Sequence, residues 1–151
     1  MKALVQRVKN ASIDFNDEII ASIGQGMLVL VGLTHSDTQK EVETIARKLV
    51  ALRIFADDQK PINASVSQID GEILLVSQFT LYANTRKGNR PSFVDAMDPD
   101  KAEALFISFC KAVEALYPKV KRGQFGADCQ ISLVNDGPTT IMLEISSEPQ
   151  V

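Results

Sequence analysis

Runs of apolar residues and alternating apolar and polar positions divide the first part of the chain into strands. Residues 3–13 and 18–23 are rich in aliphatic residues, and the polar turn at 14–17 between them predicts a hairpin. The run GMLVLVGLT at 26–34 has the length of a strand and no polar face of its own. We therefore expect this third strand to be buried on both faces.

Two later stretches carry apolar residues at helical spacing. The first runs to Val50 and has Ser36 or Asp37 as its candidate N-cap. The second begins at Asp98, which is followed by a proline suited to the first helical position, and it ends before Pro118. The pattern predicts two long helices that each present one apolar stripe to a core.

The remaining segments alternate between short strands and polar loops. A short strand is predicted at 53–55, a turn-rich loop at 57–71 and a basic loop at 83–93. Apolar and polar residues alternate over 124–133 and again over 141–145. This alternation predicts two strands, separated by the turn-forming sequence NDGPTT.

Together with a strand at 71–82, these segments predict about seven strands and two long helices. The chain length suits one α/β domain that spans 1–151. A layered sheet–sheet–helix arrangement (β/β/α) would bury every apolar face that the pattern contains.

The strand predicted at 71–82, GEILLVSQFTLY, changes character along its length. Its first half is apolar on both faces, whereas Ser77, Gln78 and Thr80 add hydrogen-bonding side chains near its end. In a continuous strand, Gln78, Thr80 and Tyr82 would share one face. These groups either bond to neighbouring backbone, as buried polar groups usually do, or line a site where the strand leaves the core. The residues alone leave both interpretations open.

Composition narrows the classes of protein that remain. The 151 residues are 45% hydrophobic and 23% charged, which is typical of a folded domain. A net charge of −3 argues against a protein that coats duplex nucleic acid, but it allows a site for one end of an RNA. No signal peptide, membrane span or lipidation signal is recognised, so a soluble cytoplasmic protein is expected.

Metal and covalent chemistry have few candidate residues. Two cysteines without CxxC spacing and one histidine, His35, suit neither a zinc site nor a disulfide scaffold, and we expect no metal or cofactor. Ser77 or Thr80 needs a base to act as a nucleophile, and there is no GxSxG elbow. His35 is the one histidine available, although a solvated loop residue is the simpler interpretation of its position.

Two loops have local features of their own. NDGPTT at 135–140 is dense turn chemistry and by itself indicates only a connection. In the basic loop, Arg86, Lys87 and Arg90 surround a glycine. This loop is either a solvated charged segment or a contact for the phosphates of an RNA end.

Two motifs that are weak alone occur together, SQFTL at 77–81 and NDGPTT at 135–140. Their order and separation resemble the two signatures of the D-aminoacyl-tRNA deacylases, an SQFT motif and a glycine–proline motif of the NxGP-T type. The segments QRVKNASI, KGNRPSF and GQFGADCQISLVNDGP are also similar to that family, so the resemblance covers essentially the whole chain. Thr139 and Cys129 stand where valine and methionine are common, and both departures conserve size.

The resemblance implies a substrate, an assembly and a set of site residues. It implies hydrolysis of the ester bond of D-aminoacyl-tRNA by a homodimer with two sites. A cis Gly137–Pro138 bond would enter the partner subunit's site, with support from Arg7, and Phe125 would border the pocket. The pocket for the aminoacylated 3′ adenosine of tRNA would be lined by Ser77, Gln78, Phe79 and Thr80.

The mechanism expected from this resemblance uses backbone groups. An aminoacyl ester is already reactive, so orientation and oxyanion stabilisation can suffice, with the N–H groups of Phe79 and Thr80 as the candidate contacts. The 2′-hydroxyl of the terminal ribose would assist the attacking water, and Thr80 as a direct nucleophile is the alternative. If L-amino acids are rejected by a clash, glycyl-tRNA should be hydrolysed too. A small-molecule esterase that uses His35 and a non-catalytic RNA-end binding module are the other function classes.

Overall fold

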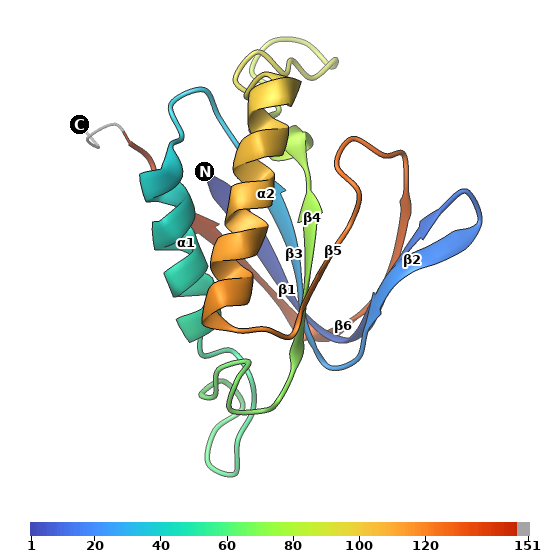
Figure 1. Ribbon diagram of the computed structural model, residues 1–151, viewed down its shortest axis with the longest axis vertical. Coiled ribbons are helices and arrows are strands. Elements are labelled where there is room, and N and C mark those ends of the chain that lie inside the picture. Colours follow the sequence, from blue (N-terminus) through green and yellow to red (C-terminus); the bar gives the residue numbers. More distant parts are fainter. Residues whose placement is uncertain (148–151) are drawn as a thin grey trace.

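The computed structural model describes residues 1–147, in which two helices lie side by side on one face of a mixed sheet (Figure 1). The helices are α1 (Gln39–Ala51) and α2 (Pro99–Leu116), and a 3₁₀ turn, η1 (Phe79–Tyr82), follows the fourth strand. The strands are β1 (Lys2–Phe15), β2 (Glu18–Ile23), β3 (Gly26–Gly32), β4 (Glu72–Ser77), β5 (Val120–Arg122) and β6 (Gln130–Glu144).

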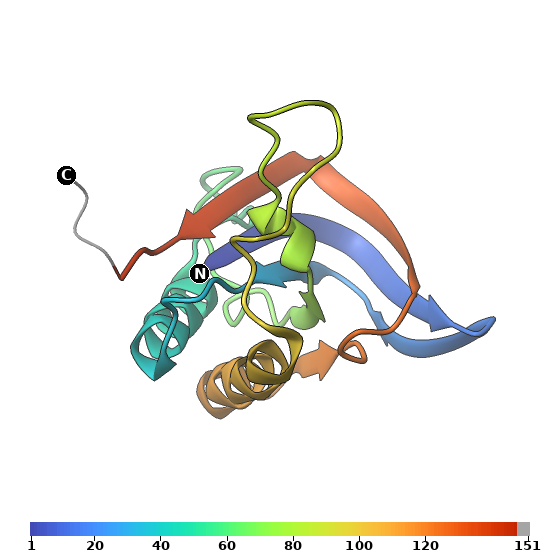
Figure 2. The ribbon, with the colours of Figure 1, turned by 90° about the horizontal axis from the view of Figure 1, so that it is seen from above.

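One long strand, β1, organises the sheet. It pairs antiparallel with β6 along most of its length, and on its other side with β3 through residues 2–8 and with β2 through residues 11–15. The strand order is β2-β1-β3-β4-β5, and β3, β4 and β5 run parallel. Because β1 changes partner along one side, the sheet curls, and β2 comes to lie near β4 and β5 (Figure 2).

Apolar side chains fill both faces of the central strands, as the run at 26–34 predicted. Met27 and Val29 of β3 belong to the core beneath the two helices. Leu28 of β3 and Leu74 of β4 belong to a second core, which the curled half of the sheet encloses with Ile23 of β2. The predicted α/β class and its layering are therefore confirmed, and one continuous sheet supplies both β layers.

The helix predictions were close, with one correction at the first N-cap. Both helices begin and end within about two residues of their expected limits. However, the cap of α1 is Thr38 rather than Ser36 or Asp37. Thr38 and Glu41 form a capping box, in which the Thr38 hydroxyl donates to the Glu41 carboxylate and lowers the pKa of that carboxyl. Neither helix within residues 1–147 is long and apolar enough to cross a membrane.

Several strand predictions were wrong. Six strands form within residues 1–147 rather than about seven, and the segment at 53–55 makes only a single bridge, from Phe55 to Ala64. The alternating residues 124–129 form a loop, and β6 continues from Gln130 to Glu144 through the NDGPTT sequence. β5 was not predicted, because its three residues are too few to show a pattern and pair only with β4.

The prediction of a strand through 82 was also wrong, and the turn found in its place shapes the site. β4 ends at Ser77, and residues 79–82 turn into η1, so Gln78, Thr80 and Tyr82 do not share a strand face. The turn packs closely on β3, where a Cβ added to Gly32 would lie 2.9 Å from the Leu81 Cβ. A glycine at that position is what allows the chain to fold back over the end of the sheet.

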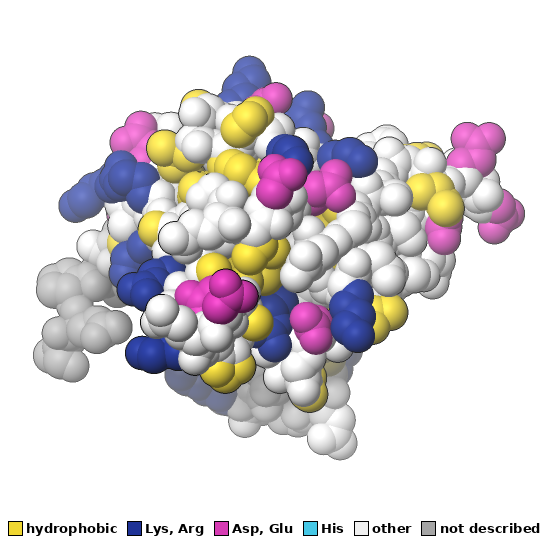
Figure 3. Space-filling model, turned by 90° about the horizontal axis from the view of Figure 1, so that it is seen from below, with side chains coloured by type: hydrophobic (Ala, Val, Ile, Leu, Met, Phe, Trp, Pro, Cys, Tyr) yellow, Lys and Arg dark blue, Asp and Glu magenta, His cyan; other side chains and the backbone are white. Residues whose placement is uncertain are grey.

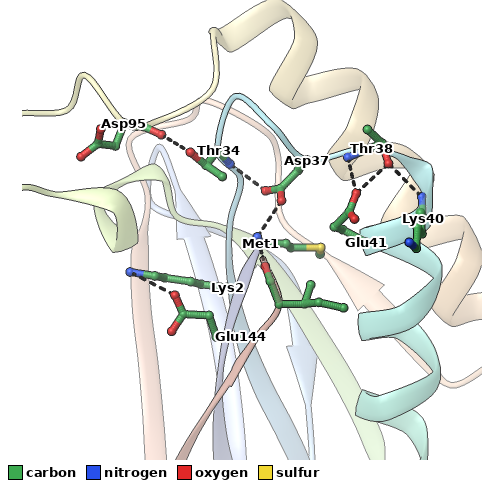
Figure 4. Close-up of polar contacts among 10 residues, drawn as sticks. Met1, Lys2, Thr34, Asp37, Thr38, Lys40, Glu41, Asp95 and Glu144 are labelled. Atoms are coloured by element: carbon green, nitrogen blue, oxygen red, sulfur yellow. Dashed lines mark hydrogen bonds and ion pairs between the residues drawn. The ribbon is translucent and has the colours of Figure 1, made fainter. Parts of the chain in front are cut away.

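A buried ion pair joins the ends of the sheet to the start of α1 (Figure 4). The α-ammonium of Met1 donates to Asp37 Oδ1 at 2.7 Å and to the Ile145 carbonyl at 2.8 Å, and both side chains of the pair are fully buried. Asp37 Oδ2 accepts a hydrogen bond from the Thr34 N–H. Thr34 in turn donates its hydroxyl to the Asp95 carbonyl, which ties this network to the loop before α2.

Candidate functional site

A pocket of about 610 Å³ opens at the carboxyl ends of the parallel strands β3 and β4. In α/β sheets, the loops that follow the strands lie at this edge, and ligand sites are common there. The residues around it come from four stretches of the chain: the end of β3, the end of β4 with residues 78–79, residues 93–97 with the start of α2, and the loop 124–129 with Ile131 of β6. The pocket is therefore assembled from parts of the chain that are far apart in sequence.

The end of β4 forms one wall of the pocket. Ser77, Gln78 and Phe79 line it, and the Gln78 N–H donates to the Val31 carbonyl at 2.7 Å as the last bond between the two strands. Phe79 is 54% exposed, and its ring meets Phe93 edge to face with 5.0 Å between ring centroids. The two rings form an apolar rim beside a polar strand end.

Two backbone donors beside this wall are free. After Gln78, the chain turns so that the Leu81 N–H donates to the Gln78 carbonyl and the Ala83 N–H donates to the Thr80 carbonyl. The intervening N–H groups of Phe79 and Thr80 have no acceptor among residues 1–147, as the opening groups of a helical turn usually do not. Two adjacent free N–H groups are suited to hold a carbonyl oxygen as negative charge develops on it.

The opposite wall includes Phe125. It lies in the loop 124–129, half-buried, and its ring packs against Phe106 of α2 with 6.1 Å between centroids. Phe93, Ala96 and Met97 complete the lining from the loop before α2. These three residues were not predicted as part of a site, although a phenylalanine in an otherwise polar and basic loop is a detectable signal.

The candidate nucleophile lacks a base. Thr80 is exposed and does not line the pocket, and its hydroxyl oxygen accepts a hydrogen bond from the Gln78 amide. The His35 ring instead donates from Nε2 to the Val94 carbonyl at 2.7 Å, and no contact joins it to Ser77 or Thr80 within residues 1–147. Tyr82 offers no base either, because burial and the negative charges of Asp37 and Glu144 raise the pKa of its phenol, which stays protonated at neutral pH.

The Gly137–Pro138 loop lies outside the pocket of its own chain. The peptide bond between them is cis, both residues are exposed, and neither lines the pocket. Arg7 braces the loop, donating from Nε to the Asp136 carbonyl at 2.9 Å and from Nη1 to the Ile54 carbonyl at 2.7 Å. Within a single chain, the structure therefore places Arg7, Gly137 and Pro138 together but apart from the other predicted site residues.

Asn135 braces the same loop from inside. Its side-chain oxygen accepts from the Thr139 N–H at 2.7 Å, and its amide donates to the Thr140 hydroxyl at 3.0 Å. Gly137 has a φ of +137°, a backbone conformation that residues with a side chain rarely adopt. An exposed loop held this firmly has a fixed shape to present to another surface.

The titratable side chains do not form a metal centre among the described residues. Within residues 1–147, no three His, Cys, Asp or Glu side chains gather in a way that could hold a metal ion. Cys110 is a buried residue of α2, and burial raises the pKa of its thiol to about 11. A reactive thiolate is therefore not available from this residue at neutral pH.

Comparison with known proteins gives consistent results over nearly the whole chain. The family described as D-Tyr-tRNA(Tyr) deacylase matches residues 4–144. A protein of Cytophaga hutchinsonii named D-aminoacyl-tRNA deacylase is 50% identical over 145 residues, which are 95% of this chain and 97% of the relative. A protein of the same name from an Exiguobacterium species is 49% identical over 95% of this chain and 98% of the relative.

Two solved structures share the fold. One is named c-Myc DNA Unwinding Element Binding Protein and superposes with a TM-score of 0.92 at 44% identity, covering 97% of this chain and 100% of the other. The second, described as a probable eukaryotic D-amino acid tRNA deacylase, has a TM-score of 0.83 at 20% identity, with coverage of 95% and 98%. At that identity, the second likeness supports the fold alone.

Proposed function

Because the chain belongs to the D-Tyr-tRNA(Tyr) deacylase family, we propose that its pocket receives the aminoacylated 3′ end of a tRNA and cleaves the ester there. The enzyme class follows from the family and from relatives at about half identity: the protein is a D-aminoacyl-tRNA deacylase, a hydrolase of carboxylic esters. We further propose the catalytic groups, the assembly and the basis of chirality that follow.

One observation carries the mechanism: two adjacent backbone N–H groups beside the pocket, of Phe79 and Thr80, have no acceptor among residues 1–147. We assign them to the oxyanion that forms when water adds to the ester carbonyl. The ester C–O bond then breaks, the amino acid leaves as its acid, and the ribose oxygen of the tRNA takes a proton. The neighbouring 2′-hydroxyl of the ribose orients the attacking water, so no side-chain nucleophile is required.

The braced Gly137–Pro138 loop suggests how the second half of the site is supplied. It is exposed, held by Arg7 and Asn135, and lies outside its own pocket, so it can serve the pocket of a second copy in a homodimer. Its backbone carbonyls would accept from the α-ammonium of the substrate. With the ester and the ammonium both held, a backbone wall at one remaining position on the α-carbon rejects the L side chain by a clash.

Deacylation of a matched series of substrates tests this function. D-Tyr-, L-Tyr-, D-Ala-, L-Ala- and Gly-tRNA should be incubated with equal enzyme, and release of the amino acid followed. We expect loss of the D-esters and of glycyl-tRNA, because glycine carries hydrogen at both positions, and survival of the L-esters. Equal loss of D- and L-esters indicates a general esterase, and binding without turnover indicates an RNA-end binding module. A glycyl ester as resistant as the L-alanyl ester contradicts selection by exclusion.

Two substitutions separate backbone from side-chain catalysis. Thr80→Ala and His35→Ala, made separately, are expected to keep kcat within about tenfold of the wild-type value, because neither side chain takes a proton or attacks the ester. A side-chain nucleophile or base would instead cost several orders of magnitude in kcat. Single-turnover kinetics on D-Tyr-tRNA measure the rate of ester cleavage by each variant. A complete loss of cleavage with Thr80→Ala, at unchanged substrate binding, would contradict the backbone mechanism.

A further inference from the structure

The loop that precedes Phe93 at the pocket rim carries a cluster of positive charge at its tip. The Asn84 N–H donates to the Ser92 carbonyl at 2.7 Å, and the Ser92 N–H donates back to Asn84 at 2.9 Å, so residues 85–91 form the tip of a hairpin. This tip projects beyond the sheet, above the start of α2 (Figure 1). Phe93, which follows the hairpin, forms the rim contact with Phe79.

The three cations of the tip are exposed and have no ion-pair partner. Arg86, Lys87 and Arg90 are all exposed, no acidic residue occurs in 83–93, and no salt bridge involves them within residues 1–147. The tip thus carries uncompensated charge on a protein whose net charge is −3. This charge is available to a ligand without breaking any existing interaction.

Two lysines near the C-terminal end of α2, Lys119 and Lys121, differ in this respect. Lys119 pairs with Asp70 at 2.7 Å, and Lys121 pairs with Glu72 at 3.7 Å while donating to the Ser22 carbonyl. On the face seen from below, basic and acidic side chains lie next to one another (Figure 3). The charges of Lys119 and Lys121 are therefore partly neutralised.

We propose that the tip at 85–91 binds the phosphates of the tRNA that precede its terminal nucleoside. This rests on the proposed function, because it assumes that the terminal nucleoside enters the pocket beside Phe79. Three residues of extended chain span at most roughly 10 Å, and the tip ends only two positions before Phe93 at the rim. The tip can therefore contact the RNA strand as it leaves the rim. Arginine matches phosphate oxygens in pairs, and lysine acts as a point charge.

If the cations of the tip bind phosphates, only a substrate that carries phosphates should depend on them. A D-aminoacyl ester of adenosine has the ester and the terminal nucleoside but no phosphate. A D-aminoacyl-tRNA has both. The variant Arg86→Gln/Lys87→Gln/Arg90→Gln should therefore cleave the adenosine ester within twofold of the wild-type kcat/KM. Its KM for D-aminoacyl-tRNA should rise by roughly tenfold at low salt, with kcat little changed.

Salt dependence provides the second readout. Each phosphate contact contributes about 0.7–0.9 to the slope of log affinity against log salt concentration. The triple variant should lose about 2–3 of that slope for D-aminoacyl-tRNA, and Lys87→Gln alone about 0.7–0.9. The matched control Lys48→Gln/Lys119→Gln/Lys121→Gln removes the same charge from elsewhere and should keep the wild-type slope.

Three outcomes overturn the proposal. The first is a triple variant with the wild-type slope, and the second is a control variant that loses as much slope as the triple variant. The third is equal damage to the adenosine ester, which would mean that the loop acts through the pocket and not on phosphates. If the wild-type protein cleaves neither substrate, the proposed function fails instead. Anisotropy measurements of uncharged tRNA binding across the same salt series then still decide whether the tip binds phosphate.

Discussion

Mixing two inactive variants, Gly137→Ala and Ser77→Phe, is expected to restore about a quarter of the wild-type deacylase activity. A Cβ at Gly137 would lie 2.9 Å from the Thr139 nitrogen and 3.2 Å from Arg7 Nη2, so alanine must distort the braced loop. Such a displacement of a positioning group can cost about 100-fold in rate. Phenylalanine at Ser77 instead adds a ring inside the 610 Å³ pocket and blocks it.

Restoration follows from the composite site that we propose. In a heterodimer, one site combines the intact pocket of the Gly137→Ala subunit with the intact loop of the Ser77→Phe subunit, and the other site carries both defects. Half of the dimers are heterodimers after random exchange, and each has one working site. Activity on D-Tyr-tRNA should be measured after mass spectrometry has established that the subunits have exchanged.

A double variant supplies the matched control. A subunit with both Gly137→Ala and Ser77→Phe, mixed with either single variant, offers no intact combination, so no activity should return. Recovery in that mixture would mean that exchange itself, and not the shared site, restores activity. No recovery in the original mixture, with heterodimers present, would show that the loop does not act across subunits.

Replacing Asp37 with alanine is expected to lower the free energy of unfolding by about 3–5 kcal/mol. The substitution leaves the Met1 ammonium without a counter-charge in a place where both side chains are fully buried. It also removes the acceptor of the Thr34 N–H, which would then be half-buried and unpaired. Urea denaturation followed by circular dichroism, with the slope checked for constancy, measures the loss.

A neighbouring ion pair is the control for this prediction. Lys2 and Glu144 stand at the same end of the sheet, 3.9 Å apart, with side chains 26% and 58% exposed (Figure 4). Glu144→Ala should therefore cost less than about 1 kcal/mol. Similar losses for the two variants would indicate that burial of the Asp37 pair contributes little to stability.

The local pattern of this sequence was enough to predict much of the fold. Residues 26–34 and 73–76 have no polar side, and both strands are buried on both faces because such a run has no other favourable place. α2 was predictable from its apolar stripe and from Pro99 at its start, since both signals act within a few residues. The order and separation of SQFTL and NDGPTT identified the family.

Tertiary structure decided the features that depend on distant partners. β5 forms because its three residues pair with the edge of β4. β4 ends at Ser77 because Gly32 of β3 allows η1 to pack closely on that strand. Asp37 looked like a helix cap, but the ammonium of Met1, brought beside it by the sheet, takes its carboxylate instead. No local pattern encodes such contacts, because their energy comes from groups that only folding brings together.

The candidate site divides in the same way. The sequence placed Ser77, Gln78 and Phe79 at the end of a buried strand, and they line the pocket. The remaining walls come from loops 93–97 and 124–129, whose side chains meet only across the folded domain. The free N–H groups of Phe79 and Thr80 exist because the strand turns into a 3₁₀ helix, which alternation along the chain could not reveal. Sequence therefore determined the chemistry available at the site, and the packing of distant segments decided its shape.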